Sequence, residues 1–132
     1  MSDLVEKHFP YDGPHSAEKL EEAADCLANL VRYLNNATRP GYQTLKHVAT
    51  IYPILGAMNS TIHGFDQLLE QLNTACQRFV DDPTVYDDRG VRPASDTVKE
   101  LSSHLVSLKK ILGGVTTNLE ITHLVASHLG NN

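Results

Sequence analysis

Cysteine is scarce in this chain of 132 residues: it occurs only at Cys26 and Cys76, fifty residues apart and without Cys-x-x-Cys spacing. Such spacing indicates neither a zinc site nor a redox pair. Both cysteines fall in helical segments rich in apolar residues, so we expect free, buried thiols that pack as small hydrophobic groups. A native disulfide is the alternative.

Long apolar runs are also absent, since no stretch approaches the roughly 20 residues of a membrane-spanning helix. The segment MSDLVEKHFPYDG has no basic stretch followed by an apolar one, which is the pattern of a secretion signal. The 41% hydrophobic and 20% charged residues are typical of a globular protein of one domain. We therefore expect a cytoplasmic protein that does not contact membranes.

An excess of positive charge is missing too. Eleven Lys and Arg residues against sixteen Asp and Glu residues give a formal charge of −5, and only Lys109 and Lys110 are adjacent basic residues. Binding to nucleic acid through phosphate neutralisation needs clustered Lys and Arg. Nucleic acid is therefore an alternative partner that the composition does not support.

What the chain does contain is three segments in which apolar residues recur at alternating spacings of three and four, as on one face of a helix. In the first, the stripe runs from Leu20 to Ala37, with Ser16 placed as N-cap. The second stripe consists of Val48, Ile51, Leu55, Met58, Ile62, Phe65, Leu69, Leu72, Cys76 and Phe79. The third consists of Val98, Leu101, Leu105, Leu108, Leu112, Val115, Leu119, Thr122, Ala126 and Leu129. We predict an all-α protein, an antiparallel bundle of three main helices at about 17–38, 51–80 and 95–129, with an extra turn or short helix at 44–49.

The ends of these helices follow from individual residues. Thr50 is the expected N-cap of the second helix, because it would place Pro53 in the first turn, where a missing N–H costs nothing. Ser95 is the expected N-cap of the third helix, and Gly130 its expected end. Residues 81–93 are a loop with four aspartates, which we assign to solvation of the helix ends because the ligand pattern of an EF-hand is absent.

Helix lengths that do not match point to a further interface. At about 1.5 Å per residue the first helix spans about 33 Å, while the second and third reach roughly 45 to 50 Å. Part of their stripe is then left for another partner. We expect residues 16–132 to form one domain, with 1–15 as an N-terminal tail, and the open seam to be covered by a second chain in a homodimer or by that tail.

No arrangement typical of an active site is apparent. The Glu120-Ile-Thr-His123 spacing is that of di-iron bundles, but there is no second copy, and in the seam register Glu120 points outward to solvent. We find no nucleophile with its base, no phosphate-binding loop and no dinucleotide fingerprint. We expect no catalytic residues, no metal site, no cofactor and no enzymatic activity.

Two stretches carry a family resemblance: VRYLNNATRP at 31–40 and ATIYPILGAMNSTIHGFDQLLEQL at 49–72. They resemble a group of small uncharacterised helical proteins of actinobacteria, whose pattern is Val-Arg-Tyr-Leu-Asn-x-Ala-Thr, then Ile/Val-Tyr-x-x-Leu-Gly, then Leu-Leu-x-Gln-Leu. The matching residues are Val31, Arg32, Tyr33, Leu34, Asn35, Ala37, Thr38, Ile51, Tyr52, Leu55, Gly56, Leu68, Leu69, Gln71 and Leu72. In those relatives a proline precedes the Ile/Val-Tyr pair, whereas here Pro53 follows it. Because some relatives are encoded near mobile-element or DNA-transfer genes, the resemblance implies an accessory role in such a system.

The polar residues of this pattern have two interpretations. Tyr33 and Asn35 could satisfy carbonyl groups at the end of the first helix. Alternatively, an interaction patch forms at this corner, since Tyr and Arg are frequent at binding hot spots. The residues of this candidate patch are Arg32, Tyr33, Asn36, Arg39 and Tyr52.

From these observations we expect a non-catalytic interaction or scaffolding protein with a protein partner. A nucleic-acid-associated accessory protein is the first alternative, through Arg32, Arg39, Lys46 and His47. A helical bundle that binds a metal or a small ligand is the second.

Overall fold

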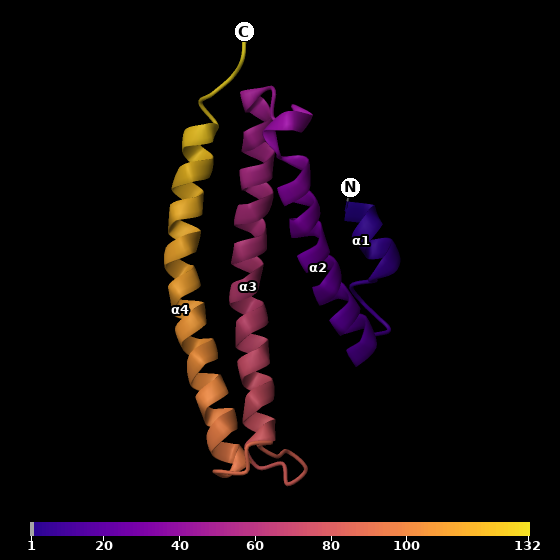
Figure 1. The fold of residues 1–132 in the computed structure, drawn as a ribbon, viewed down its shortest axis with the longest axis vertical. Helices are drawn as coiled ribbons and strands as arrows, with labels where there is room; N and C mark the ends of the chain where they lie inside the picture. The colour runs from indigo at the N-terminus through magenta and orange to yellow at the C-terminus, as the bar shows by residue number, and fades with distance from the viewer. Residues whose placement is uncertain (1) are drawn as a thin grey trace. The chain divides into compact units, whose positions relative to one another are not determined.

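The computed structural model describes residues 2–132 and divides the chain into two compact units, Met1–Lys46 and His47–Asn132. The first unit contains the helices α1 (Ser2–His8) and α2 (Ala17–Ala37), and the second contains α3 (Ile51–Phe79) and α4 (Ala94–Ala126) (Figure 1). Short 3-10 turns occur at Pro40–Tyr42 and Val48–Thr50. No strand occurs among residues 2–132, which confirms the all-α prediction.

In the first unit, α2 begins and ends through side chains that satisfy its backbone. Ser16 is the N-cap as predicted: its backbone is extended, and its Oγ accepts a hydrogen bond from the Lys19 N–H at 3.1 Å. At the other end the Thr38 hydroxyl donates to the Leu34 carbonyl at 2.8 Å, and the Thr44 hydroxyl donates to the Ala37 carbonyl. Threonines, rather than Tyr33 and Asn35, thus supply the hydrogen bonds expected at this end. The N-terminal segment 1–15, predicted as a tail, contains α1.

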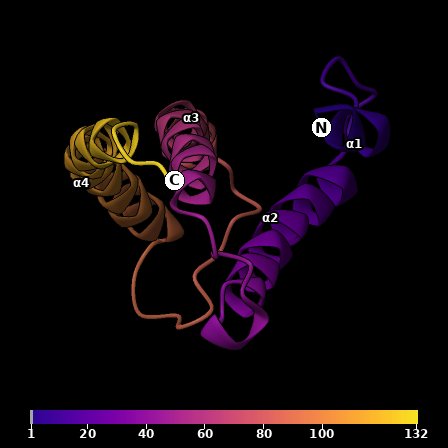
Figure 2. The same ribbon diagram turned by 90° about the horizontal axis from the view of Figure 1, so that it is seen from above.

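In the second unit, α3 and α4 lie side by side and antiparallel, joined by the loop that follows α3 (Figures 1 and 2). The start of α3 agrees with the prediction, and Pro53 lies in its first turn. Thr50 occupies the N-cap position as predicted, but its backbone is helical and its side chain makes no capping bond. The reason is that the turn Val48–Thr50 leads directly into α3, with the Thr50 N–H donating to the His47 carbonyl at 3.1 Å. This turn lies near the extra helix expected at 44–49.

Both ends of α4 differ from the prediction. The helix begins at Ala94, and Pro93 rather than Ser95 occupies the N-cap position, with its carbonyl accepting from the Asp96 N–H at 3.1 Å. It ends at Ala126, well before Gly130, because the Ser127 N–H closes the last turn by donating to the His123 and Leu124 carbonyls. Helix 95–129 is thus shorter at its C-terminal end than predicted. Ser127 thus ends the helix, whereas the sequence predicts that Gly130 does so.

Few side chains are fully buried. Within the part of the chain that the structure describes, only Leu69, Cys76 and Val98 are buried hydrophobic residues. All three lie in the antiparallel pair formed by α3 and α4, which we call the hairpin. Cys76 is a buried free thiol, as expected, whereas Cys26 is a free thiol on the exposed surface of α2, which corrects that part of the prediction. The hairpin core is therefore narrow, and much of the predicted apolar stripe lies outside it.

Candidate interaction surface

The core of the hairpin uses one half of each predicted stripe. On α3, residues recurring every seven positions face α4 and are buried or half-buried: Leu55, Ile62, Leu69 and Cys76. On α4 the corresponding row is Val98, Leu105, Leu112, Leu119 and Ala126. In the heptad of a coiled coil these rows are the d positions.

The second contact row of each helix is polar rather than apolar. The Ser102 hydroxyl donates to Asn73 and receives a hydrogen bond from the Gln77 amide at 3.2 Å. Further along the hairpin, Lys109 lies 3.3 Å from Glu70 and 3.9 Å from Asp66. We call this side of the hairpin the polar edge. Its charged groups find partners within the hairpin itself.

The polar edge continues to the end of the hairpin nearest Ala126. Here the Tyr52 ring stacks on the His123 ring, with centroids 4.2 Å apart and planes 17° apart. The stack explains Gly56, because a Cβ at this position would lie only 3.1 Å from His123 Nε2. Gly64, by contrast, has open space around it. Of these two glycines in α3, only Gly56 lies at a close approach to α4.

The seam register predicts that Glu120 points outward to solvent, but in the structure its carboxylate also contacts α3. Its Oε1 lies 2.8 Å from His63 Nε2, which forms a partly exposed pair across the hairpin. Such a surface pair contributes little to stability, typically below about 1 kcal/mol. The Glu120–His123 motif does not gather further ligands: among residues 2–132 no group of three or more His, Cys, Asp or Glu side chains is arranged to hold a metal ion.

The other half of each predicted stripe forms a separate surface. Its large apolar side chains are Ile51, Met58, Phe65, Leu72 and Phe79 on α3, and Leu101, Leu108 and Val115 on α4. Beyond Val115 the row on α4 continues with the polar Thr122, and Leu129 lies past the end of the helix. These are the g positions of the heptads, and in an antiparallel pair both g rows fall on the same side of the hairpin. We call this surface the apolar face.

Exposure distinguishes the apolar face from the core beside it. Met58 is 45% exposed, Phe79 44% and Leu101 51%. Each lies only three residues along its helix from a buried or half-buried residue of the core row. None of the eight residues is charged. The hairpin therefore has charged and polar groups on one side and a continuous uncharged row of large side chains on the other.

The predicted patch divides between the two units. Arg32, Tyr33, Asn36 and Arg39 lie on the exposed surface at the end of α2 and just after it, in the first unit. Tyr52 belongs to the second unit, where its ring packs on His123. Sequence reasoning missed this stack and the His63–Glu120 pair. The signal for both would have been the register of the hairpin, which pairs residues far apart in sequence.

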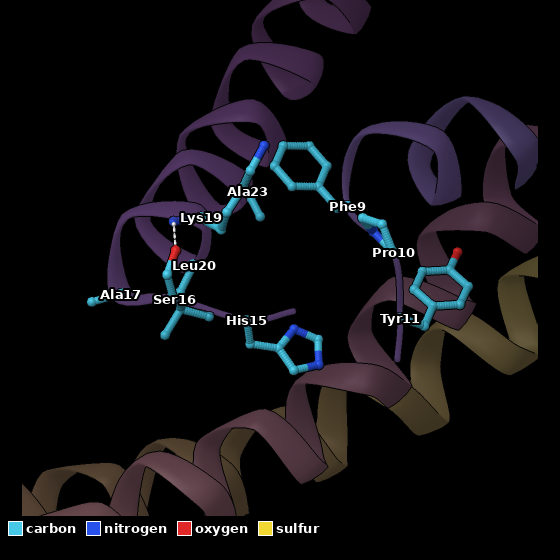
Figure 3. A pocket seen from close by; sticks show the side chains of 9 residues that line it. All are labelled: Phe9, Pro10, Tyr11, His15, Ser16, Ala17, Lys19, Leu20 and Ala23. Atoms are coloured by element: carbon cyan, nitrogen blue, oxygen red, sulfur yellow. Dashed lines mark hydrogen bonds between the residues drawn. The ribbon is translucent and has the colours of Figure 1, made fainter. Parts of the chain in front are cut away.

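Arg39 and Lys46, two residues of the nucleic-acid alternative, line one shallow depression of about 380 Å³ in the first unit, together with Thr38, Pro40, Gln43, Thr44 and Leu45. A larger depression of about 520 Å³ lies between α2 and the segment that follows α1 (Figure 3). There Lys19 donates to the His8 carbonyl at 3.5 Å, and its Nζ lies 5.5 Å from the centre of the Phe9 ring. These contacts tie the N-terminal segment to α2.

Two of the four aspartates of the loop, Asp82 and Asp87, accept hydrogen bonds that stabilise turns. Asp82 accepts from both the hydroxyl and the N–H of Thr84, which lowers the pKa of its carboxyl group. Asp87, whose side chain is only 3% exposed, accepts from Arg89 at 2.6 Å and from the Thr97 hydroxyl. The bonds from Arg89 and then Thr97 hold its pKa far below the ordinary value. The loop thus has a local structural role, more specific than the solvation that we expected.

No protein-family model matches the chain, and no curated protein or solved structure is significantly similar to it. The resemblance to actinobacterial helical proteins stays a prediction. None of the helices described is long and apolar enough to cross a membrane.

Proposed function

We propose that this protein is a helical interaction module that binds another protein chain through the apolar face of the α3–α4 hairpin. The observation that carries the proposal is the face itself: large uncharged side chains recur every seven residues on one side of both helices and stay partly exposed. The resemblance adds the proposal that the protein is accessory to a mobile-element or DNA-transfer system.

The pattern supports binding rather than chance exposure. Single apolar residues on a surface are ordinary, but a contiguous apolar patch usually marks an interaction site. A helix within a bundle contacts two neighbours and therefore carries two apolar rows, one for each of them. Here α3 and α4 each use one row for the other helix. The second row has the same seven-residue spacing, from Ile51 to Phe79 on α3 and from Leu101 to Val115 on α4, as expected if it serves a further helix.

The distribution of charge supports the same proposal. Lys109 contacts both Asp66 and Glu70 on the polar edge, on the opposite side from the apolar face. Apolar surface that is free of charge can be buried by a partner without the large cost of removing an ion from water. The hairpin can therefore bind by burial alone.

Site-specific photo-crosslinking in cells that express the protein tests this proposal. A benzophenone amino acid replaces Met58 on the apolar face, and in a matched variant it replaces Gln67. Gln67 is exposed and lies nine residues further along α3, on the opposite side at about 100° per residue. We expect a discrete crosslinked protein from position 58, identified by mass spectrometry, and none from position 67. Identical products from both positions, or none from position 58, would contradict the proposal.

A further inference from the structure

We infer that the partner on the apolar face is a second copy of this chain, so that two α3–α4 hairpins pack face to face as a four-helix bundle. This inference rests on the proposed function, because it names the partner of the same surface. It follows from the area, the length and the charge of the face.

The area is close to what a stable dimer needs. Seven of the eight residues are between 38% and 51% exposed, Phe65 is half-buried, and the neighbouring Leu68, Ile111 and Val125 extend the face at its margins. At roughly 80 to 100 Å² for each side chain, one hairpin offers on the order of 900 Å², compared with about 800 Å² per partner in a standard interface. A second hairpin would cover this area in a single contact.

The length of the face fits a second hairpin better than a single short helix. Along α3 the face runs from Ile51 to Phe79, about 42 Å, and along α4 it runs from Leu101 to Val115, about 21 Å. A helix of 21 residues, such as α2, spans only about 31 Å. An identical hairpin supplies two helices of matching length, and their apolar rows have the same seven-residue period.

Charge favours self-association at this face in particular. The chain has a net charge of −5, so most of its surface repels a second copy. A two-fold interface brings the same patch of both chains together, which requires a patch free of like charges. The apolar face has no Asp, Glu, Lys or Arg. The face therefore offers no charged group to a partner that binds through opposite charge.

Light scattering of the full chain during size exclusion, from about 1 to 200 µM, tests the inference. We expect a mass of twice 14.6 kDa at high concentration. The double variant Leu72→Glu/Leu108→Glu places a carboxylate in each helix of the face and should raise the dissociation constant at least about 100-fold, since it buries unpaired charge. The control Gln67→Glu/Ser103→Glu adds the same charge at exposed positions away from the face and should stay dimeric.

Two results would overturn the inference: a wild-type mass of 14.6 kDa across the whole range, or a Leu72→Glu/Leu108→Glu variant that dimerises as tightly as the control. Circular dichroism checks that the variants keep their helices. If the carboxylates unfold the hairpin, Leu72→Gln/Leu108→Gln repeats the test with neutral side chains. A monomer that still crosslinks to a different protein from position 58 would refute self-association but leave the proposed function intact. Loss of the position-58 crosslink would refute both.

Discussion

Replacing Gly56 and Gly64 by alanine separates helix propensity from close packing within one helix. Alanine stabilises a helix interior by about 1 kcal/mol relative to glycine. At Gly64 a new Cβ meets nothing within 4 Å, so Gly64→Ala should raise the free energy of unfolding by about that amount. At Gly56 the new Cβ would lie 3.1 Å from His123 Nε2 and 3.5 Å from Cε1. The ring must therefore retreat by a few tenths of an ångström.

That retreat disturbs the stack of His123 on Tyr52. Because stacked aromatic pairs contribute about 0.5 to 1.5 kcal/mol, we expect the disturbance to offset the propensity gain and Gly56→Ala to be near neutral. Urea denaturation at a fixed protein concentration measures both variants. In a His123→Ala background the obstacle is gone, and Gly56→Ala should then stabilise by about 1 kcal/mol. Equal stabilisation by both alanines in the wild-type background would refute the packing argument.

Three further predictions concern stability. Leu69→Ala empties a buried position in the hairpin and should lower the free energy of unfolding by about 2 to 3 kcal/mol in urea, and a loss below about 1 kcal/mol would show that this core is not packed as described. Ser16→Ala removes the N-cap of α2 at a cost of about 1 kcal/mol, which hydrogen exchange should register in α2 and leave unchanged in α4. The hydrogen bonds from Arg89 and Thr97 lower the folded pKa of Asp87 below the unfolded value of about 3.9, so its stabilisation is complete above about pH 5 and is lost as the pH falls further. Asp87→Asn should therefore lower the melting temperature at pH 7 and have a smaller effect at pH 2, whereas an equal effect at both would be inconsistent with this role.

The helices could be predicted because their periodicity is local. Alternating spacings of three and four placed α2, α3 and α4 within a few residues of their observed bounds, and the Ser16 cap was confirmed in detail. The N-cap position of α3 was predicted correctly at Thr50, but the turn Val48–Thr50 takes the place of its side-chain cap. At α4 the predicted N-cap Ser95 was wrong, because Pro93 occupies this position. A hydroxyl residue near a helix start is only one of several ways to satisfy the first N–H groups.

The predicted seam was half right for a physical reason. A stripe with 3-4 spacing contains two rows of residues, each with a period of seven. In a contact between two helices, one of these rows faces the partner together with a third row, which lies outside the stripe. The hairpin therefore uses the Leu69 row together with the polar row of Asn73, and leaves the Leu72 row outside. Periodicity along one helix does not specify this rotation. The His63–Glu120 pair and the Tyr52–His123 stack depend on the same rotation and on the register between helices, and were missed for that reason.

Oxidation of Met58 by hydrogen peroxide, followed by peptide mass spectrometry, tests most directly whether the apolar face is a binding surface. Met58 lies on this face and is 45% exposed in the single chain. We predict that it oxidises several-fold more slowly in the wild-type protein at about 100 µM than in the Leu72→Glu/Leu108→Glu variant at the same concentration. The Gln67→Glu/Ser103→Glu control should oxidise as slowly as the wild type. Equal rates in all three proteins would contradict the account, because the apolar face would then be uncovered even at high concentration.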